Sequence, residues 1–274
     1  MPNSFYKEYK KSIDFFIKNA LSEDIRDGDL TAKACISSKS IKSAKLNVKT
    51  PCIIAGINLV EKIYKFYDSE IKFKKLIADG AYVNIDSTPF LVEGNTRSIL
   101  ATERVVLNTL QRMSSIATIT NNLKKKIESF DTVLLDTRKT TPNFRYPEKW
   151  AVKIGGGQNH RMGLFDAIMI KDNHIDYSIT LKEVLLKTQI YLEKLKPKKI
   201  FVVVEARNIK EIKKVLNFSW VNRILLDNMS ISEIEKAVKI IGGRIQTEAS
   251  GNINEYNIVN VAKTGVNYIS MGAL

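Results

Sequence analysis

The chain has 274 residues, of which 44% are hydrophobic and 26% charged, a balance that suits a globular protein of one large or two moderate domains. It contains no uncharged apolar run long enough to cross a bilayer, and residues 1–11 are too polar for a signal peptide, so we expect a cytoplasmic protein without a membrane partner. The two cysteines, Cys35 and Cys52, match neither a redox pair nor a zinc site, which argues against disulfides and thiolate-bound metal.

The formal net charge of +14 raises the question of nucleic-acid binding, because clustered lysines neutralise phosphates without reading sequence. The lysine clusters are scattered over predicted helix ends and turns, at residues 124–126, 196–199 and 213–214. No arginine-rich tract interleaved with aromatic residues accompanies them. We therefore expect no nucleic-acid partner and keep a catalytically idle, basic binding protein as a minor alternative.

Residues 1–112 predict an N-terminal α+β domain with an antiparallel sheet. The expected helices cover residues 5–21 and the segment after Gly56, and the expected strands cover residues 43–49, 71–77 and 89–92. Residues 98–127 predict one long helix that links two domains, with Ser114 and Ser115 as a weak point where it could be interrupted.

Residues 113–274 predict an α/β-barrel domain, because short, β-branched apolar runs alternate with helical segments. The expected strands are residues 133–135, 167–170, 201–204, 223–226, 244–247 and 268–270, and the expected helices are residues 181–195, 209–216, 232–240 and 256–263. Six strands are fewer than the eight of a complete barrel, so either the α/β barrel with parallel strands is incomplete or weak strands escape this pattern; we predict the incomplete barrel. A doubly wound open sheet is the alternative.

Each apolar run of this second domain stops at a polar or small residue, which places chemistry at the carboxyl ends of the strands. Four cations, Arg138, Lys139, Arg161 and Lys171, fall in one stretch, residues 134–174, and suggest a binding site for a small ligand with several carboxylates or phosphates. Glycines 155–157, Asn159 and His160 add hydrogen-bonding groups to it. The competing interpretations are an exposed basic surface and, for His160 and His174, structural histidines.

Two strand-end carboxylates, Glu205 and Asp227, predict a Mg²⁺ site that faces substrate phosphates, although pairing with local cations is the alternative. Gly251 and Gly272, at the last two strand ends, could present backbone N–H groups to a phosphate. Other nucleotide and hydrolase motifs fail: the glycines at 155–157 do not complete a dinucleotide fingerprint, no phosphate-binding P-loop is present, and Ser250 lacks a nucleophile elbow.

Several motifs together resemble the quinolinate phosphoribosyltransferase family, also called nicotinate-nucleotide pyrophosphorylase (carboxylating). They are LDTRKTTP at 135–142, GGGQNHRMG at 155–163, IKDNH at 170–174, LDNM at 226–229, EASG at 248–251 and YISMGA at 268–273. The similarity extends upstream through EDI at 23–25, GDLT at 28–31, AG at 55–56 and ERVVLNTLQR at 103–112, so it covers essentially the whole chain in order.

The resemblance implies an N-terminal α/β domain beside an incomplete barrel, and a homodimer whose active sites lie at subunit interfaces. It implies that phosphoribosyl is transferred from phosphoribosyl pyrophosphate to quinolinate with loss of CO₂, which gives nicotinate mononucleotide for NAD biosynthesis. Mg²⁺ is the implied cofactor and no organic cofactor is required. A related phosphoribosyltransferase-like protein with another acceptor is the alternative.

The resemblance also implies roles for individual residues. It assigns quinolinate binding to Arg138, His160, Arg161 and Lys171, with Arg104 reaching in from the partner subunit. It assigns binding of phosphoribosyl pyrophosphate to Lys139, Glu205, Asp227, Ser250, Gly251 and Gly272, metal binding to Glu205 and Asp227, and catalysis to Lys139, Lys171, Glu205 and Asp227. The chain departs from the family pattern where Arg26, Ser115 and Asn143 replace glycine.

Overall fold

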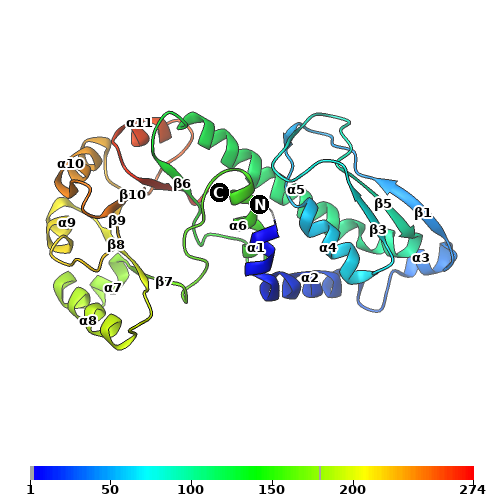
Figure 1. Ribbon diagram of the computed structural model, residues 1–274, viewed down its shortest axis with the longest axis horizontal. Coiled ribbons are helices and arrows are strands. Elements are labelled where there is room, and N and C mark those ends of the chain that lie inside the picture. The colour runs from blue at the N-terminus through cyan, green and yellow to red at the C-terminus, as the bar shows by residue number, and fades with distance from the viewer. Residues whose placement is uncertain (1–2, 179) are drawn as a thin grey trace. The chain divides into compact units, whose positions relative to one another are not determined.

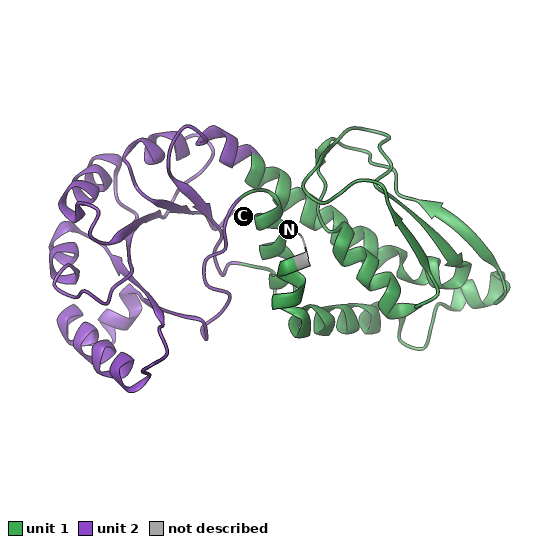
Figure 2. Cartoon of the chain, viewed as in Figure 1, with its two compact units in different colours: residues 1–121, 140–156 green, residues 122–139, 157–274 purple. Residues whose placement is uncertain are grey.

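The computed structural model describes residues 3–178 and 180–274. The chain divides into two compact units, the first formed by Met1–Asn121 with Thr140–Gly156 and the second by Asn122–Lys139 with Gly157–Leu274 (Figure 2). The domain boundary expected at residue 112 stays a prediction, because compact units need not coincide with domains that fold independently. Of the helices described, none combines the length and apolarity that a membrane crossing needs.

The first unit pairs helices with two small antiparallel sheets (Figure 1). Strand β5 is central in a sheet of order β1-β5-β3, and β2 pairs with β4. The elements are α1 (Asn3–Glu8), α2 (Lys10–Ile25), α3 (Leu30–Cys35), β1 (Ile41–Lys45), β2 (Cys52–Ile53), α4 (Ile57–Tyr67), β3 (Lys72–Lys75), β4 (Tyr82–Val83), β5 (Phe90–Asn95) and α6 (Arg145–Ile154). The predicted α+β character with an antiparallel sheet is confirmed.

One expectation for this unit is wrong in detail. The strand predicted at residues 43–49 is shifted to Ile41–Lys45; it is an edge strand that pairs only with β5, and all its residues are exposed. The predicted long helix is confirmed as α5 (Thr96–Lys126), which continues through Ser114 and Ser115 without a break. The Ser114 hydroxyl accepts a hydrogen bond from the Ala55 N–H at 3.0 Å and donates one to the Ala55 carbonyl at 3.3 Å. It therefore does not compete for the helix's own hydrogen bonds.

The second unit contains one parallel sheet of order β6-β11-β10-β9-β8-β7. Its strands are β6 (Val133–Leu135), β7 (Ala167–Ile170), β8 (Phe201–Ala206), β9 (Arg223–Asp227), β10 (Gln246–Ser250) and β11 (Tyr268–Ser270). The helices are α7 (Asp172–Asp176), α8 (Leu181–Lys194), α9 (Ile209–Val215), α10 (Ile231–Ile241) and α11 (Ile258–Lys263), and α8 to α11 lie outside the curved sheet (Figure 1). No ladder joins β6 to β7 among the described residues, so the predicted incomplete barrel is confirmed.

Alternation along the strands separates the core from the barrel interior. Val204, Leu226 and Ala249 face outward and pack in the apolar core beneath the helices. Their neighbours Glu205 and Asp227 therefore face inward, as do Glu248 and Ser250 on β10. Strand β10 begins two residues later than predicted because the Arg244 side chain donates to the carbonyls of Ile240 and Ile241 at the end of α10.

Candidate active site

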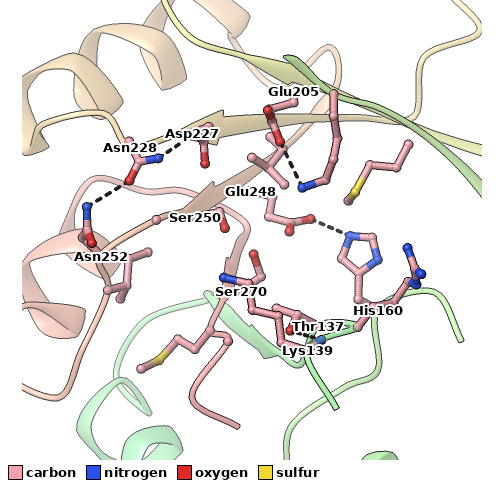
Figure 3. A pocket seen from close by; sticks show the side chains of 18 of the residues that line it. Thr137, Lys139, His160, Glu205, Asp227, Asn228, Glu248, Ser250, Asn252 and Ser270 are labelled. Carbon is pink, nitrogen blue, oxygen red and sulfur yellow. Dashed lines mark hydrogen bonds and ion pairs between the residues drawn. The ribbon is translucent and has the colours of Figure 1, made fainter. Parts of the chain in front are cut away.

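A cavity of about 510 Å³ opens at the carboxyl ends of the strands in the second unit (Figure 3). Ten of the eleven residues predicted for the site line it: Arg138, Lys139, His160, Arg161, Lys171, Glu205, Asp227, Ser250, Gly251 and Gly272. They come from the ends of six strands and one loop, separated by up to 134 positions in sequence, so only the parallel sheet brings them together.

The cations of the cavity are held close enough to affect each other. Burial lowers the pKa of the Arg161 guanidinium, the positive charge of Arg138 lowers it further, and Asp166 opposes both. Arg161 is fixed by a 3.2 Å hydrogen bond from Nη1 to the carbonyl of Ala167. A Cβ on Gly272 would lie 2.8 Å from Cδ of Lys139, so the glycine leaves room for the lysine stem. Repelling cations in one cavity are stabilised by an anionic ligand.

The loop that carries His160 is anchored by Asp136, a buried carboxylate at the end of β6. Its oxygens accept the backbone N–H of His160 at 2.8 Å and the side-chain amide of Asn159 at 2.6 Å. Asn159 therefore supports the loop and is not among the residues that line the cavity. His160 itself accepts the backbone N–H of Arg161 through Nδ1 at 2.7 Å, and its Nε2 lies 3.3 Å from Glu248 Oε2.

The two predicted metal-binding carboxylates lie on the neighbouring strands β8 and β9. Burial raises the pKa of the Glu205 carboxyl and the negative charge of Asp227 adds to the rise, while the Asp172 N–H at 3.2 Å and the Lys171 ammonium at 3.5 Å oppose it. Two carboxylates that repel each other at the edge of an anion-binding cavity suit Mg²⁺, which takes one or two carboxylates, several waters and substrate phosphate oxygens. The described residues contain no cluster of three or more acidic, histidine or cysteine ligands, so an all-protein metal cage does not form there.

A chain of amides that was not predicted from the sequence orients Asp227. Asn228 Nδ2 donates to Asp227 Oδ2 at 2.7 Å, and Asn252 Nδ2 donates to Asn228 Oδ1 at 3.0 Å (Figure 3). Gly251 has a φ of +91°, and a Cβ there would lie 2.2 Å from Asn228 Oδ1. The signal that could have indicated these amides is position, since each asparagine directly follows a residue predicted at a strand end.

Comparison with known proteins gives the same assignment over nearly the whole chain. The model of the quinolinate phosphoribosyl transferase C-terminal domain matches residues 116–274, and that of the N-terminal domain matches residues 29–114. A quinolinate phosphoribosyltransferase [decarboxylating] of Nicotiana tabacum, named as mitochondrial, is 42% identical over 273 residues, covering 94% of this chain and 77% of its own. The chain belongs to the quinolinate phosphoribosyltransferase family.

Solved structures of this family share the fold. The nicotinate-nucleotide pyrophosphorylase of Francisella tularensis superposes with a TM-score of 0.86 at 37% identity, covering 96% of this chain and 91% of that one. The structure named NadC from Streptococcus pyogenes gives a TM-score of 0.88 at 34% identity, covering 95% and 90% of the two chains. These neighbours confirm the fold class expected for a quinolinate phosphoribosyltransferase.

The eleventh predicted residue, Arg104, belongs to the first unit of this quinolinate phosphoribosyltransferase. It is an exposed residue of α5 and lines a separate hollow of about 550 Å³ within that unit, together with Glu23, Asp24, Asn108 and Arg112. His174 is exposed and accepts the Lys171 N–H through Nδ1 at 3.0 Å, so it caps α7 in the structural role expected for it.

The departures from the glycine pattern have visible backbone consequences. Arg26 has a φ of +46° and Asn143 a φ of +62°, conformations that glycine adopts freely. Asparagine tolerates positive φ, whereas arginine is strained there. Ser115 lies inside α5, where a side chain is accommodated without a special φ.

Proposed function

We propose that this cavity transfers phosphoribosyl from phosphoribosyl pyrophosphate to quinolinate with decarboxylation, giving nicotinate mononucleotide, pyrophosphate and CO₂ in de novo NAD biosynthesis. One observation carries the assignment to this place in the molecule: four cations, two strand-end carboxylates and two glycines of the phosphate loops line one cavity. Both substrates carry several negative charges, and the cavity offers a subsite for each.

We assign the quinolinate subsite to Arg138, Arg161 and Lys171, and we expect the His160 side chain to line it. Quinolinate has two adjacent ring carboxylates, and the guanidinium group of arginine binds a carboxylate through two parallel hydrogen bonds. The mutual repulsion of Arg138 and Arg161 supports this role, because it is relieved when a dianion lies between them.

We assign the phosphoribosyl pyrophosphate subsite to the opposite strand ends. Glu205 and Asp227 are carboxylates that can accept from the ribose hydroxyls and hold Mg²⁺, which when bound neutralises the departing pyrophosphate. Ser250, Gly251 and Gly272 supply a hydroxyl and backbone groups for phosphate oxygens. Lys139, whose stem crosses Gly272, lies where it can stabilise the negative charge that develops between the two substrates.

Charges develop on the substrates during the reaction, and charged groups of the cavity are already placed to stabilise them. The C1–O bond of the ribose breaks, pyrophosphate keeps the electron pair, and the quinolinate nitrogen forms the new bond to the electron-poor C1. The ring nitrogen becomes cationic, so the adjacent carboxylate can leave as CO₂ with its electron pair kept on the ring carbon. A proton from the medium replaces it. Fixed arginines and lysines hold the reactants in line and require no organic cofactor.

We propose further that the enzyme is a cytoplasmic homodimer in which Arg104 completes the quinolinate subsite of the second copy. Its support is the exposure of Arg104 and its position in a hollow of the first unit. Plant relatives are named as mitochondrial or chloroplastic, so location is a point on which members differ.

An acceptor panel tests the proposed reaction. Purified protein is incubated with phosphoribosyl pyrophosphate, Mg²⁺ and either quinolinate or nicotinate, and nucleotides are separated by chromatography. We expect nicotinate mononucleotide from quinolinate and at most trace product from nicotinate, which lacks the second carboxylate. Preference for nicotinate or another acceptor supports the related phosphoribosyltransferase instead, and no product from well-folded protein contradicts both.

A further inference from the structure

The interior of the barrel contains a buried ion pair beneath the cavity. Arg223, the first residue of β9, is 8% exposed, and Glu248, in the middle of β10, is fully buried. Arg223 Nη1 lies 3.0 Å from Glu248 Oε2. None of the proposed steps uses Arg223, and a buried arginine needs a reason because desolvation of a charge is costly.

Arg223 is held on several sides, so its guanidinium has little freedom. Its Cζ lies 3.7 Å from the ring centroid of Tyr268 on β11 and 5.2 Å from that of Phe201 on β8. Nη2 donates to Gln246 Oε1 at 3.4 Å. All four residues are at or near the amino ends of their strands, so Arg223 approaches Glu248 from the side opposite to the cavity mouth.

Glu248 connects this ion pair to the cavity wall. Its carboxylate lines the cavity and lies 3.3 Å from His160 Nε2 (Figure 3). Burial opposes ionisation of Glu248, but the contact with His160 Nε2, the Ser270 hydroxyl and the charge of Arg223 together keep its pKa below the ordinary value. Glu248 is thus an anion positioned to accept from the imidazole.

The contacts of the two ring nitrogens of His160 favour one tautomer. A backbone N–H is always a donor, so Nδ1, which accepts from Arg161 N–H at 2.7 Å, carries no proton. The ring proton is then on Nε2, facing Glu248. A second proton on Nδ1 would face the Arg161 N–H directly, which would place two donors against each other.

We propose that Arg223 is a positioning residue: by pairing with Glu248 it keeps His160 neutral, Nε2-protonated and turned toward the barrel interior, so that lysine and arginine alone supply the positive charge of the cavity. The inference about the ring rests on contacts alone, and its consequence for catalysis rests on the proposed function.

This arrangement has a chemical use in a decarboxylation. The leaving carboxylate becomes neutral CO₂, so each extra cation beside it stabilises the bound substrate more than the transition state and slows the step. A neutral His160 forms a wall of fixed shape without adding such a charge. Glu248 without Arg223 would instead favour proton uptake by the pair, because a lone buried anion is strongly destabilised.

Charged groups face His160 from several elements. They are Glu248 on β10, Arg223 on β9, Asp136 after β6, which accepts the His160 backbone N–H, and the cavity cations Arg138, Lys139, Arg161 and Lys171. Among them Arg223 is the buried cation that contacts Glu248 directly, so its removal changes the charge balance of the pair most.

Nitrogen-15 NMR of labelled histidine tests the proposal, because the chain has only two histidines and a His174→Asn variant assigns the signals. Protonated and unprotonated ring nitrogens have well-separated shifts. In the unliganded wild type we expect His160 to show a protonated Nε2 and an unprotonated Nδ1 near neutral pH. A protonated Nδ1 would overturn the proposal, whether or not the protein turns over substrate.

Substitutions then test the role of Arg223. In Arg223→Met, which keeps much of the side-chain length, we expect the nitrogen-15 shift of His160 Nδ1 at neutral pH to move toward the protonated position, because Glu248 loses its cation. Adding Glu248→Gln should restore the wild-type shift, and the double variant leaves no buried charge unpaired, so it should fold. Arg223→Lys and Arg244→Met, the latter at an exposed position after α10, should keep the wild-type shift. An unchanged Nδ1 shift in folded Arg223→Met, or no restoration in the double variant, would overturn the proposal.

Kinetics separate positioning from a general loss of structure. Arg223→Met should raise KM for quinolinate or lower kcat at saturating quinolinate by about tenfold, with KM for phosphoribosyl pyrophosphate nearly unchanged. An equal loss for both substrates would identify Arg223 as a purely structural residue. Because the NMR measurement needs no turnover, failure of this inference and failure of the proposed function are distinguishable.

Discussion

The ammonium of Lys171 lies 3.5 Å from Oε2 of Glu205, at the edge where β7 and β8 end. The contact joins a residue of the proposed quinolinate subsite to a residue of the proposed metal and ribose subsite. Even so, burial keeps the pKa of Glu205 above its ordinary value. The folded state therefore disfavours the ionised form that the proposed chemistry needs.

Glu205→Gln should make the protein more stable and less active. A carboxyl whose folded pKa is raised stabilises the fold only below its unfolded pKa, and that contribution is lost as pH rises through the folded pKa. At pH 7 the substitution should raise the free energy of unfolding by about 1 kcal/mol, and at pH 3 the gain should vanish. Activity should fall at least about 100-fold.

Denaturant unfolding at both pH values measures this effect. Glu235→Gln, at an exposed position of α10, is the matched control and should change neither stability nor activity appreciably. Loss of stability at pH 7 in Glu205→Gln would show that the ion pair with Lys171 outweighs the burial cost.

Gly251→Ala should impair binding of phosphoribosyl pyrophosphate. The new Cβ would lie 2.2 Å from Asn228 Oδ1 and would displace the amide that holds Asp227. We expect kcat/KM for this substrate to fall about tenfold or more, since small misplacements of positioning groups have large effects. Gly243→Ala is the control: its φ of +73° imposes the same kind of strain, but a Cβ there meets nothing within 4 Å. Equal effects of the two changes would rule out the contact with Asn228 as the cause.

Arg26→Gly should stabilise the first unit. Arg26 follows α2 with a φ of +46° and a ψ of −112°, which glycine adopts at little cost. We expect the free energy of unfolding to rise by about 1 kcal/mol, with activity unchanged. Arg26→Ala keeps the Cβ and the strain, so thermal unfolding should show no comparable gain for alanine. A gain of the same size for both would place the effect in the arginine side chain and not in the backbone.

Mixing two inactive variants tests the shared site of the proposed homodimer. Arg104→Ala and Arg138→Ala subunits each lack one part of the quinolinate subsite, but a mixed dimer rebuilds one intact site. Equal mixing should restore roughly a quarter of wild-type activity if subunits pair at random. No recovery, despite subunit exchange shown by native mass spectrometry, would contradict a site shared between copies.

Much of the second unit could be predicted from the sequence because its strands are short apolar runs that end at polar residues. The same pattern is enough to place Glu205 and Asp227 at one edge of the sheet, and they line the same cavity. The Arg223–Glu248 pair could not be predicted, since each residue resembles an ordinary strand residue until the register of β9 and β10 is known. The position of β1 at the edge of its sheet could not be predicted either, because it depends on pairing with the distant strand β5.

The most direct test of the central claim measures release of CO₂ and formation of the nucleotide in one reaction. Quinolinate labelled in the carboxylate next to the ring nitrogen is incubated with the protein and Mg²⁺, with or without phosphoribosyl pyrophosphate. We predict labelled CO₂ only when the donor is present, in equal amount to nicotinate mononucleotide, and at least about 100-fold less of both with Asp227→Asn. Release of CO₂ without the donor, or nucleotide formation that survives Asp227→Asn unchanged, would contradict the account.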